Sequence, residues 1–230
     1  MRPALLCALA LCLLAGCAHD PDAIPSLDQG PPDLPYRAWY LGLLAPDYME
    51  VWVESVDVID RRGLVYEHVT GGVVSVGTPP DNQGTPKDWP ASPGGGKGKD
   101  LTGIDLPEII FVRWQSLVEP QTYNVRINVP AWVRKAMVTK ERPACPWAGD
   151  WAKDVTTGYR SFITIGLAPG GIAKVWLQGV CLEAIEIGRF EGVVSKLGPD
   201  QGQSGGQYAV PLEPESRAYI DTFGIPYGSW

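Results

Sequence analysis

Stretches in which apolar and polar residues alternate recur along most of this chain. Residues 51–58 and 182–187 alternate with a period of two, which gives a strand one buried face and one face in water. The dipeptides Ala45-Pro46 and Ala168-Pro169 interrupt the apolar runs and predict turns. The pattern therefore predicts a mainly β protein, all-β or α+β, built from antiparallel sheets. Further strands are expected at residues 109–115, 123–129 and 161–167.

Helical patterns are few and short. Residues 130–137 and 214–223 each begin with proline, which is tolerated in the first turn because its missing N–H would have no partner inside the helix. Gly224 follows the second segment and is a typical stop signal. We therefore expect one or two short helices beside the sheets.

The strand patterns occur in two similar sets, near residues 40–84 and 164–206. The order of the matching pieces is kept, and their spacing differs by a few residues. An internal duplication that gives two related β units explains this order; the alternative is that hairpins reuse the same turn and strand residues. The first set is residues 41–46, 51–52, 53–58 and 72–75, and the second is residues 165–169, 175–176, 182–187 and 192–195.

Two loops follow equivalent strands of these sets. Residues 78–103 form a long irregular loop with a glycine-rich end, and residues 198–206 form a second glycine-rich loop. We expect the loops to lie side by side as one rim that contacts a partner. Trp89 would anchor that partner, although a tryptophan packed beneath its own loop is an equally good interpretation. The expected contact residues are Trp89, Lys97, Lys99 and Ser204.

The first residues carry a targeting signal. A basic start is followed by an uncharged apolar run that ends in Leu14-Ala15-Gly16-Cys17. This ending resembles the bacterial lipoprotein box, which implies cleavage after residue 16 and lipid on Cys17. The alternative is an ordinary signal peptide that happens to contain a cysteine. The resemblance implies a membrane anchor through Cys17, and Ala18 after it favours the periplasmic face of the outer membrane.

The signal divides the chain into three parts. Residues 1–16 are the signal peptide, and residues 17–35, rich in proline and aspartate, are the lipidated cysteine and a flexible tether. Residues 36–230 are a single β-rich periplasmic domain. The formal net charge of −7 argues against nucleic acid as a partner.

Two cysteines remain in the body once the signal is removed. With Cys17 committed to lipid, Cys145 and Cys181 are left as a pair, and in an oxidising compartment such a pair usually forms a disulfide. Two buried thiols, or a metal pair that lacks further ligands, are the alternatives.

Catalytic motifs are weak. Gly202-Gln203-Ser204-Gly205-Gly206 fits the pattern G-x-S-x-G, but no helix follows at once, and a nucleophile elbow needs one. A serine hydrolase would need a triad of His68, Asp105 and Ser204, which is possible because triads assemble from any order along the chain. Neither a metal site nor a cofactor is expected, because His68 stands alone in the body and the cysteines lack zinc-site spacing.

Several stretches of the body resemble a known family. Residues 98–123, the run Ile165-Gly166-Leu167-Ala168-Pro169-Gly170-Gly171, and the tail Gly224-Ile225-Pro226-Tyr227-Gly228-Ser229-Trp230 are similar to the proteobacterial lipoprotein family called domain of unknown function 2931. The likeness covers residues 36–230. It implies no enzymatic activity that can be assigned to residues, and it associates the chain with type VI secretion effectors.

These observations favour a lipid-anchored, non-catalytic periplasmic binding protein, most concretely an immunity protein that neutralises a secreted toxin. The first alternative is a structural or assembly lipoprotein of the cell envelope. A weaker alternative is a serine hydrolase that uses Ser204.

Overall fold

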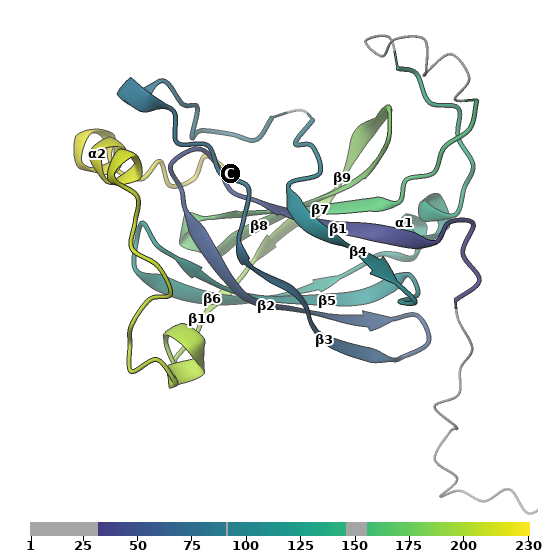
Figure 1. The fold of residues 1–230 in the computed structure, drawn as a ribbon, viewed down its shortest axis with the longest axis horizontal. Helices are drawn as coiled ribbons and strands as arrows, with labels where there is room; N and C mark the ends of the chain where they lie inside the picture. Colours follow the sequence, from purple (N-terminus) through teal and green to yellow (C-terminus); the bar gives the residue numbers. More distant parts are fainter. Residues whose placement is uncertain (1–31, 91, 146–155) are drawn as a thin grey trace, which may run out of the picture. The chain divides into compact units, whose positions relative to one another are not determined.

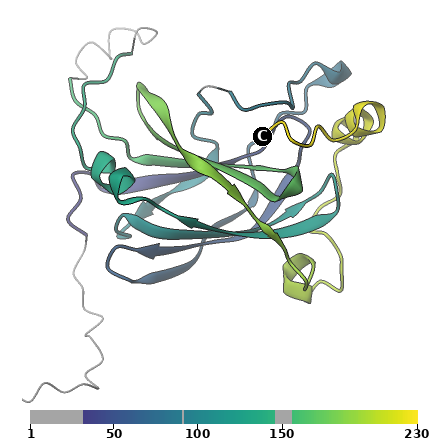
Figure 2. The ribbon, with the colours of Figure 1, turned by 180° about the vertical axis from the view of Figure 1, so that it is seen from behind.

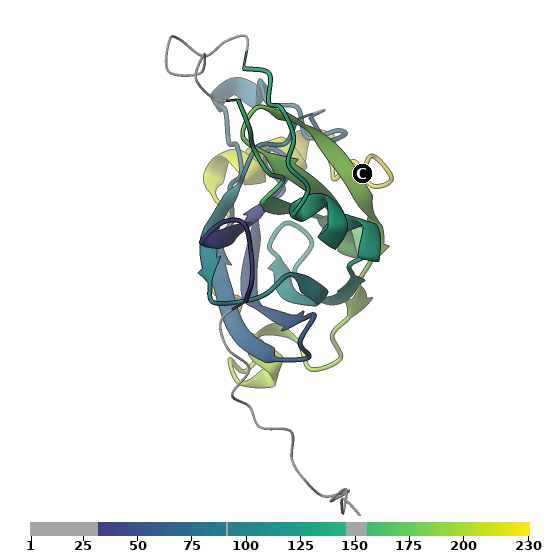
Figure 3. The same ribbon diagram turned by 90° about the vertical axis from the view of Figure 1, so that its right-hand side faces the viewer.

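Two five-stranded sheets lie face to face in the computed structural model, which describes residues 32–90, 92–145 and 156–230 (Figures 1 and 3). Sheet A has the strand order β4 (Lys97–Thr102), β1 (Ala38–Leu44), β7 (Phe162–Ala168), β8 (Ile172–Gly179) and β9 (Leu182–Glu191). Sheet B has the order β10 (Val193–Val194), β6 (Gln121–Asn128), β5 (Pro107–Ser116), β2 (Val51–Asp60) and β3 (Val65–Val73). The mainly β class expected from the sequence is confirmed.

The core lies between the sheets and follows directly from the alternation. Ile163, Ile165 and Leu167 of β7 are fully buried, as are Ile110 and Val112 of β5. The residues between them in each strand point to the outer faces, because successive side chains of a strand alternate. Burial of such inner faces is the main stabilising contribution in a sandwich of this kind.

One pairing departs from the antiparallel expectation. Strand β1 runs parallel to β7, with Tyr40 opposite Phe162 and Leu44 opposite Gly166, whereas every other pairing between described strands is antiparallel. The parallel pair sits in the middle of sheet A and joins segments that are far apart in the sequence (Figure 1).

The two sheets share one continuous stretch of chain. Strand β9 ends at Glu191 in sheet A, and β10 begins at Val193 in sheet B, so that only Gly192 separates them (Figure 2). A Cβ atom at Gly192 would lie 2.8 Å from the Trp114 ring and 3.1 Å from the carbonyl oxygen of Gly171. Glycine is therefore needed where the chain crosses between the sheets.

Both expected helices are present. Helix α1 (Ala131–Met137) buries Val133 and Met137 in the core between the sheets. Helix α2 (Pro214–Phe223) instead packs outside sheet A, where Tyr219 stacks on Tyr48 with ring centroids 4.4 Å apart. Short 3-10 segments in the described part of the chain, η1 (Pro80–Asn82), η3 (Pro169–Gly171) and η4 (Pro199–Gly202), lie in connections.

A second apolar cluster covers one end of the outer face of sheet A. Its members come from the turn after β1, from the β5–β6 turn, from the adjoining ends of β7 and β8 and from the C-terminal segment. The Trp230 indole N–H donates to the carbonyl oxygen of Pro86 over 2.8 Å and so ties the last residues to the long loop. The buried members of the cluster are Tyr48, Met49, Val118, Ala168, Ile172, Tyr219 and Trp230.

The expected duplication is not confirmed. Strands β1 and β2, which belong to the first set, lie in different sheets, whereas β7 and β8 of the second set are neighbours in sheet A. Trp52 consequently lies on the outer face of sheet B and Trp176 on the outer face of sheet A. The shared residues reflect similar strand and turn chemistry, because alternation and a proline turn do not specify which sheet the next strand joins.

The long loop is shorter than expected, and the two loops do not form one rim. Residues 97–102 of the expected loop are strand β4, whose backbone pairs with β1 despite a sequence rich in lysine and glycine. The remaining part lies on sheet A, whereas the 198–206 loop contacts Glu54 of sheet B (Figures 1 and 3). The rim hypothesis fails because it depended on the duplication.

Candidate functional site

The glycine-rich end of the long loop lies directly on the outer face of sheet A. The Thr164 hydroxyl donates to the carbonyl oxygen of Gly94 over 3.1 Å, and the Tyr40 hydroxyl donates to that of Gly96 over 3.2 Å. A Cβ atom at Gly42 of β1 would overlap the carbonyl oxygen of Gly95. The close approach of the two backbones therefore fixes the loop against the sheet.

Gln178 of β8 is buried beneath this loop with a defined amide orientation. Its Nε2 donates to the carbonyl oxygen of Gly94 over 2.7 Å and to the hydroxyl of Thr164 over 2.8 Å. A carbonyl oxygen can only accept, so the atom beside Gly94 must be the nitrogen. Both hydrogens of the amide are then used, and its Oε1 remains an acceptor with no hydrogen bond to the described residues.

A cavity of about 650 Å³ opens beside Gln178, and we call it the outer cavity. Its floor is formed by side chains of three neighbouring strands of sheet A, and its two walls come from the glycine-rich loop and from the β8–β9 turn. Phe162 in the floor meets the Tyr40 ring edge to face, with centroids 5.5 Å apart. The lining includes Ser92, Gly94, Phe162, Gln178, Leu182 and Ala184.

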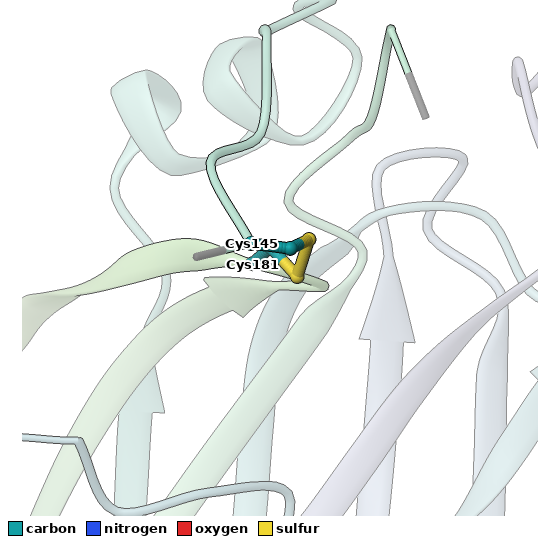
Figure 4. Close-up of a disulfide and its surroundings, with 2 residues drawn as sticks. All are labelled: Cys145 and Cys181. Atoms are coloured by element: carbon teal, nitrogen blue, oxygen red, sulfur yellow. A yellow bond between two sulfur atoms is a disulfide. The ribbon is translucent and has the colours of Figure 1, made fainter. Parts of the chain in front are cut away.

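The second wall of the outer cavity contains the cysteine pair. Cys145 and Cys181 are joined in the structure, with their Cα atoms 5.1 Å apart (Figure 4). The backbone N–H of Ala144 also donates to the carbonyl oxygen of Cys181 over 3.1 Å. The sequence prediction that these two cysteines form a pair is thus supported, and the bond fixes the β8–β9 turn to the segment before residue 146.

Trp89 packs beneath its own loop. Its ring meets Trp176 edge to face with centroids 5.4 Å apart, and it covers Gly166 so closely that a Cβ atom there would lie 2.6 Å from the ring. A separate cavity of about 340 Å³ lies on the other side of the loop, with Trp89 in its wall. The side chain is half-buried, so little of it is available to a partner.

Lys97 and Lys99 lie on strand β4, at the edge of sheet A, and both are exposed. They stand opposite Leu43 and Leu41, which places them on the core-facing side of the strand. Charged residues at inward positions of an edge strand prevent a second sheet from pairing there. This arrangement gives the lysines a structural explanation that needs no partner.

Ser204 lies far from the other expected contact residues, beside sheet B. Its hydroxyl donates to the carbonyl oxygen of Pro199 over 3.1 Å. Neither His68 nor Asp105 joins it: the backbone N–H of His68 donates to Asp57, and the Asp105 carboxylate accepts from Arg61 Nε over 2.7 Å. The structure therefore does not assemble the triad that the sequence suggested.

Asp105 belongs instead to a charged cluster near the β2–β3 turn. The neighbouring Asp60 is fully buried and accepts hydrogen bonds from the Arg62 side chain and from the backbone N–H groups of Arg62, Leu64 and Asp105. Burial acts to raise the pKa of Asp60, but these hydrogen bonds outweigh it and lower the pKa below its usual value. The cluster stabilises the turn.

Metal binding has no support in the described ranges, where no group of three His, Cys, Asp or Glu side chains is placed to hold an ion. The chemistry that the outer cavity offers is recognition: an apolar floor, one amide acceptor and a preformed wall. Cys17 lies outside the described residues, so its expected lipid attachment is not addressed by the structure. No helix among the described residues has the length and apolar character needed to cross a membrane.

Sequence reasoning missed Phe162, Thr164 and Gln178. Alternation within β7 and β8 places all three on one outer face, but it also makes them look like solvated positions. The missing information is that a loop more than 60 residues away in the sequence folds over them.

Comparisons with known proteins give one result. The family described as "Protein of unknown function (DUF2931)" matches residues 23–228. No curated protein and no solved structure matches the chain.

Proposed function

The chain belongs to the DUF2931 family, and we propose that it is a lipid-anchored, non-catalytic binding protein on the periplasmic face of the outer membrane. The observation that carries the proposal is the agreement between two distant features. The Leu14-to-Cys17 sequence resembles a lipoprotein signal, and the body holds Cys145 and Cys181 at disulfide distance. Disulfides persist in the oxidising compartment to which such a signal directs a chain.

Binding is favoured over catalysis by the state of the best nucleophile candidate. The Ser204 hydroxyl donates to a backbone carbonyl oxygen. The backbone N–H of His68 donates to Asp57, and the Asp105 carboxylate accepts from Arg61. An acidic body of this kind suits a basic protein partner, and we propose a secreted toxin, which makes the chain an immunity protein.

The anchor is tested by replacing the lipidated residue. Cys17→Ser should abolish labelling by radioactive palmitate and shift the protein from the membrane fraction to the soluble fraction or to unprocessed precursor. Cys145→Ser is the matched control, because it removes a different thiol and should keep the label. Palmitate on Cys17→Ser would show that the signal has been misread.

The partner is tested from the exposed strand β4. A photo-crosslinking amino acid at Lys99 in intact cells should trap one exported toxin when that toxin is produced, and the same group at Ser204, beside sheet B, should not. Cells that produce the wild-type chain should survive a toxin that kills cells lacking it. If the protein crosslinked at Lys99 is instead a resident component of the cell envelope, the structural or assembly alternative is favoured.

A further inference from the structure

We infer that the outer cavity binds a small, mostly apolar molecule that carries an N–H or O–H donor and no negative charge. The inference needs neither lipid on Cys17 nor a protein partner, and so it stands apart from the proposed function. It rests on the size of the cavity, the accessible acceptor of Gln178, the lack of a cation in the described lining and the way the walls are held.

The cavity has the dimensions and the surface of a ligand site. Its volume of about 650 Å³ falls within the range of roughly 300–1,000 Å³ that small-molecule pockets occupy. The floor is apolar where Phe162, Leu182 and Ala184 meet, and the edge-to-face contact with Tyr40 holds the Phe162 ring in place. A flat aromatic body matches such a floor because ring faces and edges attract each other at these distances.

The Gln178 amide in the floor favours a ligand that carries a hydrogen-bond donor. Gln178 is only 6% exposed, and both hydrogens of its Nε2 are committed to Gly94 and Thr164. Its Oε1 accepts no hydrogen bond from the described residues. The oxygen is accessible to solvent and Gln178 lines the cavity, so a ligand N–H or O–H can replace water on it. A ligand with acceptors alone cannot.

The lining offers no cation to a negative ligand. Among the described residues that line the cavity there is no lysine, arginine or histidine, and Glu183 is exposed and alternates along β9 with Leu182 and Ala184 of the floor. Lys97 and Lys99 lie on the edge strand and do not contribute to the lining. A negative ligand would therefore lose hydration without gaining a compensating charge.

The walls are fixed before any ligand arrives. One wall is held by the contact of Gly95 with Gly42 and by the hydrogen bonds to Gly94, and the other is held by the Cys145–Cys181 bond. A preformed pocket avoids the ordering cost that a flexible loop would add to binding.

The test uses two fluorescent probes with the same aromatic body. Phenylnaphthylamine is neutral and carries one N–H, and anilinonaphthalenesulfonate adds a negative group. Titrated into the full chain carrying Cys17→Ser with its disulfide intact, the neutral probe should bind saturably and at least about tenfold more tightly than the sulfonate. Equal affinities in the parent chain would overturn the charge argument.

Filling the cavity locates the site. Ala184→Trp places an indole on the floor and should weaken binding of the neutral probe by at least about tenfold, whereas Val180→Trp adds the same ring at an exposed turn position outside the lining and should not. If Ala184→Trp does not fold, Ser92→Trp fills the cavity from the opposite wall and should have the same effect.

Two results would overturn the inference. One is the absence of saturable binding by the parent chain. The other is unchanged affinity in a folded cavity-filling variant, which would place the probe elsewhere, including on the apolar signal sequence. Neither result affects palmitate labelling or survival against a toxin, so failure here is distinguishable from failure of the proposed function.

Discussion

Trp89 shows how much the meaning of one residue depends on what it contacts. It lies in a loop among proline and polar residues, where a tryptophan is often an interface anchor. In the structure its ring lies against Trp176 and Gly166, on the outer face of sheet A. It therefore contributes to folding in the same way as a core side chain.

Replacing Trp89 should cost stability. Trp89→Ala should lower the free energy of unfolding by about 2 kcal/mol, somewhat less than for a fully buried tryptophan, because the side chain is only partly buried. Urea unfolding with the disulfide intact measures the change. Trp132→Ala is the matched control, because Trp132 is 45% exposed on α1 and its removal should cost well under half as much. Similar losses in the two variants would contradict the packing role.

Asp60 gives a prediction with a pH dependence. Its lowered native pKa means that the carboxylate stabilises the fold above its usual value of 3.8, and that this contribution is lost as the pH falls through that value toward the native pKa. Asp60→Asn should therefore destabilise the chain by about 2–3 kcal/mol at pH 7, and the difference from the wild type should shrink below pH 4.

The measurement for Asp60 is urea unfolding at a series of pH values. Asp100→Asn, on the exposed strand β4, removes a carboxylate of the same type and should change stability little at any pH. If the difference in unfolding free energy between the wild type and Asp60→Asn stays constant down to pH 3, the Asp60 carboxylate does not stabilise the fold in the proposed way.

At the scale of elements, local pattern was a good guide to strands and helices and a poor guide to their partners. The strand expected at residues 109–115 is β5, and the helix expected at residues 214–223 is α2. Strand β4 was missed because Lys97, Gly98 and Lys99 have low strand propensity, and its formation depends on backbone pairing with β1. The assignment of β1 and β2 to different sheets has no local signal at all.

The disulfide acts at this scale because it joins the β8–β9 turn to a segment 36 residues away in the sequence. Replacing both Cys145 and Cys181 by serine should destabilise the chain by roughly 3–4 kcal/mol, since the unfolded state loses a closed loop. Reductant should lower the unfolding midpoint of the wild type to that of the double variant and leave the variant unchanged. If reductant does not change the unfolding midpoint of the wild type, even when it is added to the unfolded protein, the two thiols are not joined.

At the scale of the whole described body, the two outer faces differ. The long loop and the C-terminal segment cover much of the outer face of sheet A, and Trp230 links them through Pro86. The candidate site exists only because these remote segments meet on the sheet. Its cysteines could be predicted by elimination, but Gln178 and Phe162 could not, since nothing in their local sequence indicates what lies over them.

Trp230→Ala should loosen this covering layer as a unit. The loss of a buried indole and of its hydrogen bond to Pro86 should lower stability by about 3 kcal/mol. Hydrogen exchange should accelerate in residues 84–96 and in α2, while β5 and β6 in sheet B keep their relative protection. Tyr227→Phe, in the same tail, removes only an exposed hydrogen bond to Glu119 and keeps the ring, so it should leave both segments protected. Uniform acceleration across both sheets would show that the layer is not a separate unit.

The parallel pairing of β1 with β7 has a kinetic consequence. Tyr40 and Phe162 face each other across 122 residues of sequence, so the centre of sheet A cannot form until most of the chain is present. Closing so large a loop is slow, and folds rich in distant contacts fold slowly. A chain that emerges from its N-terminus therefore carries β1 as an apolar segment without its neighbour for most of its synthesis. The same delay keeps the chain extended, which is the state in which a polypeptide can be threaded through a narrow export channel.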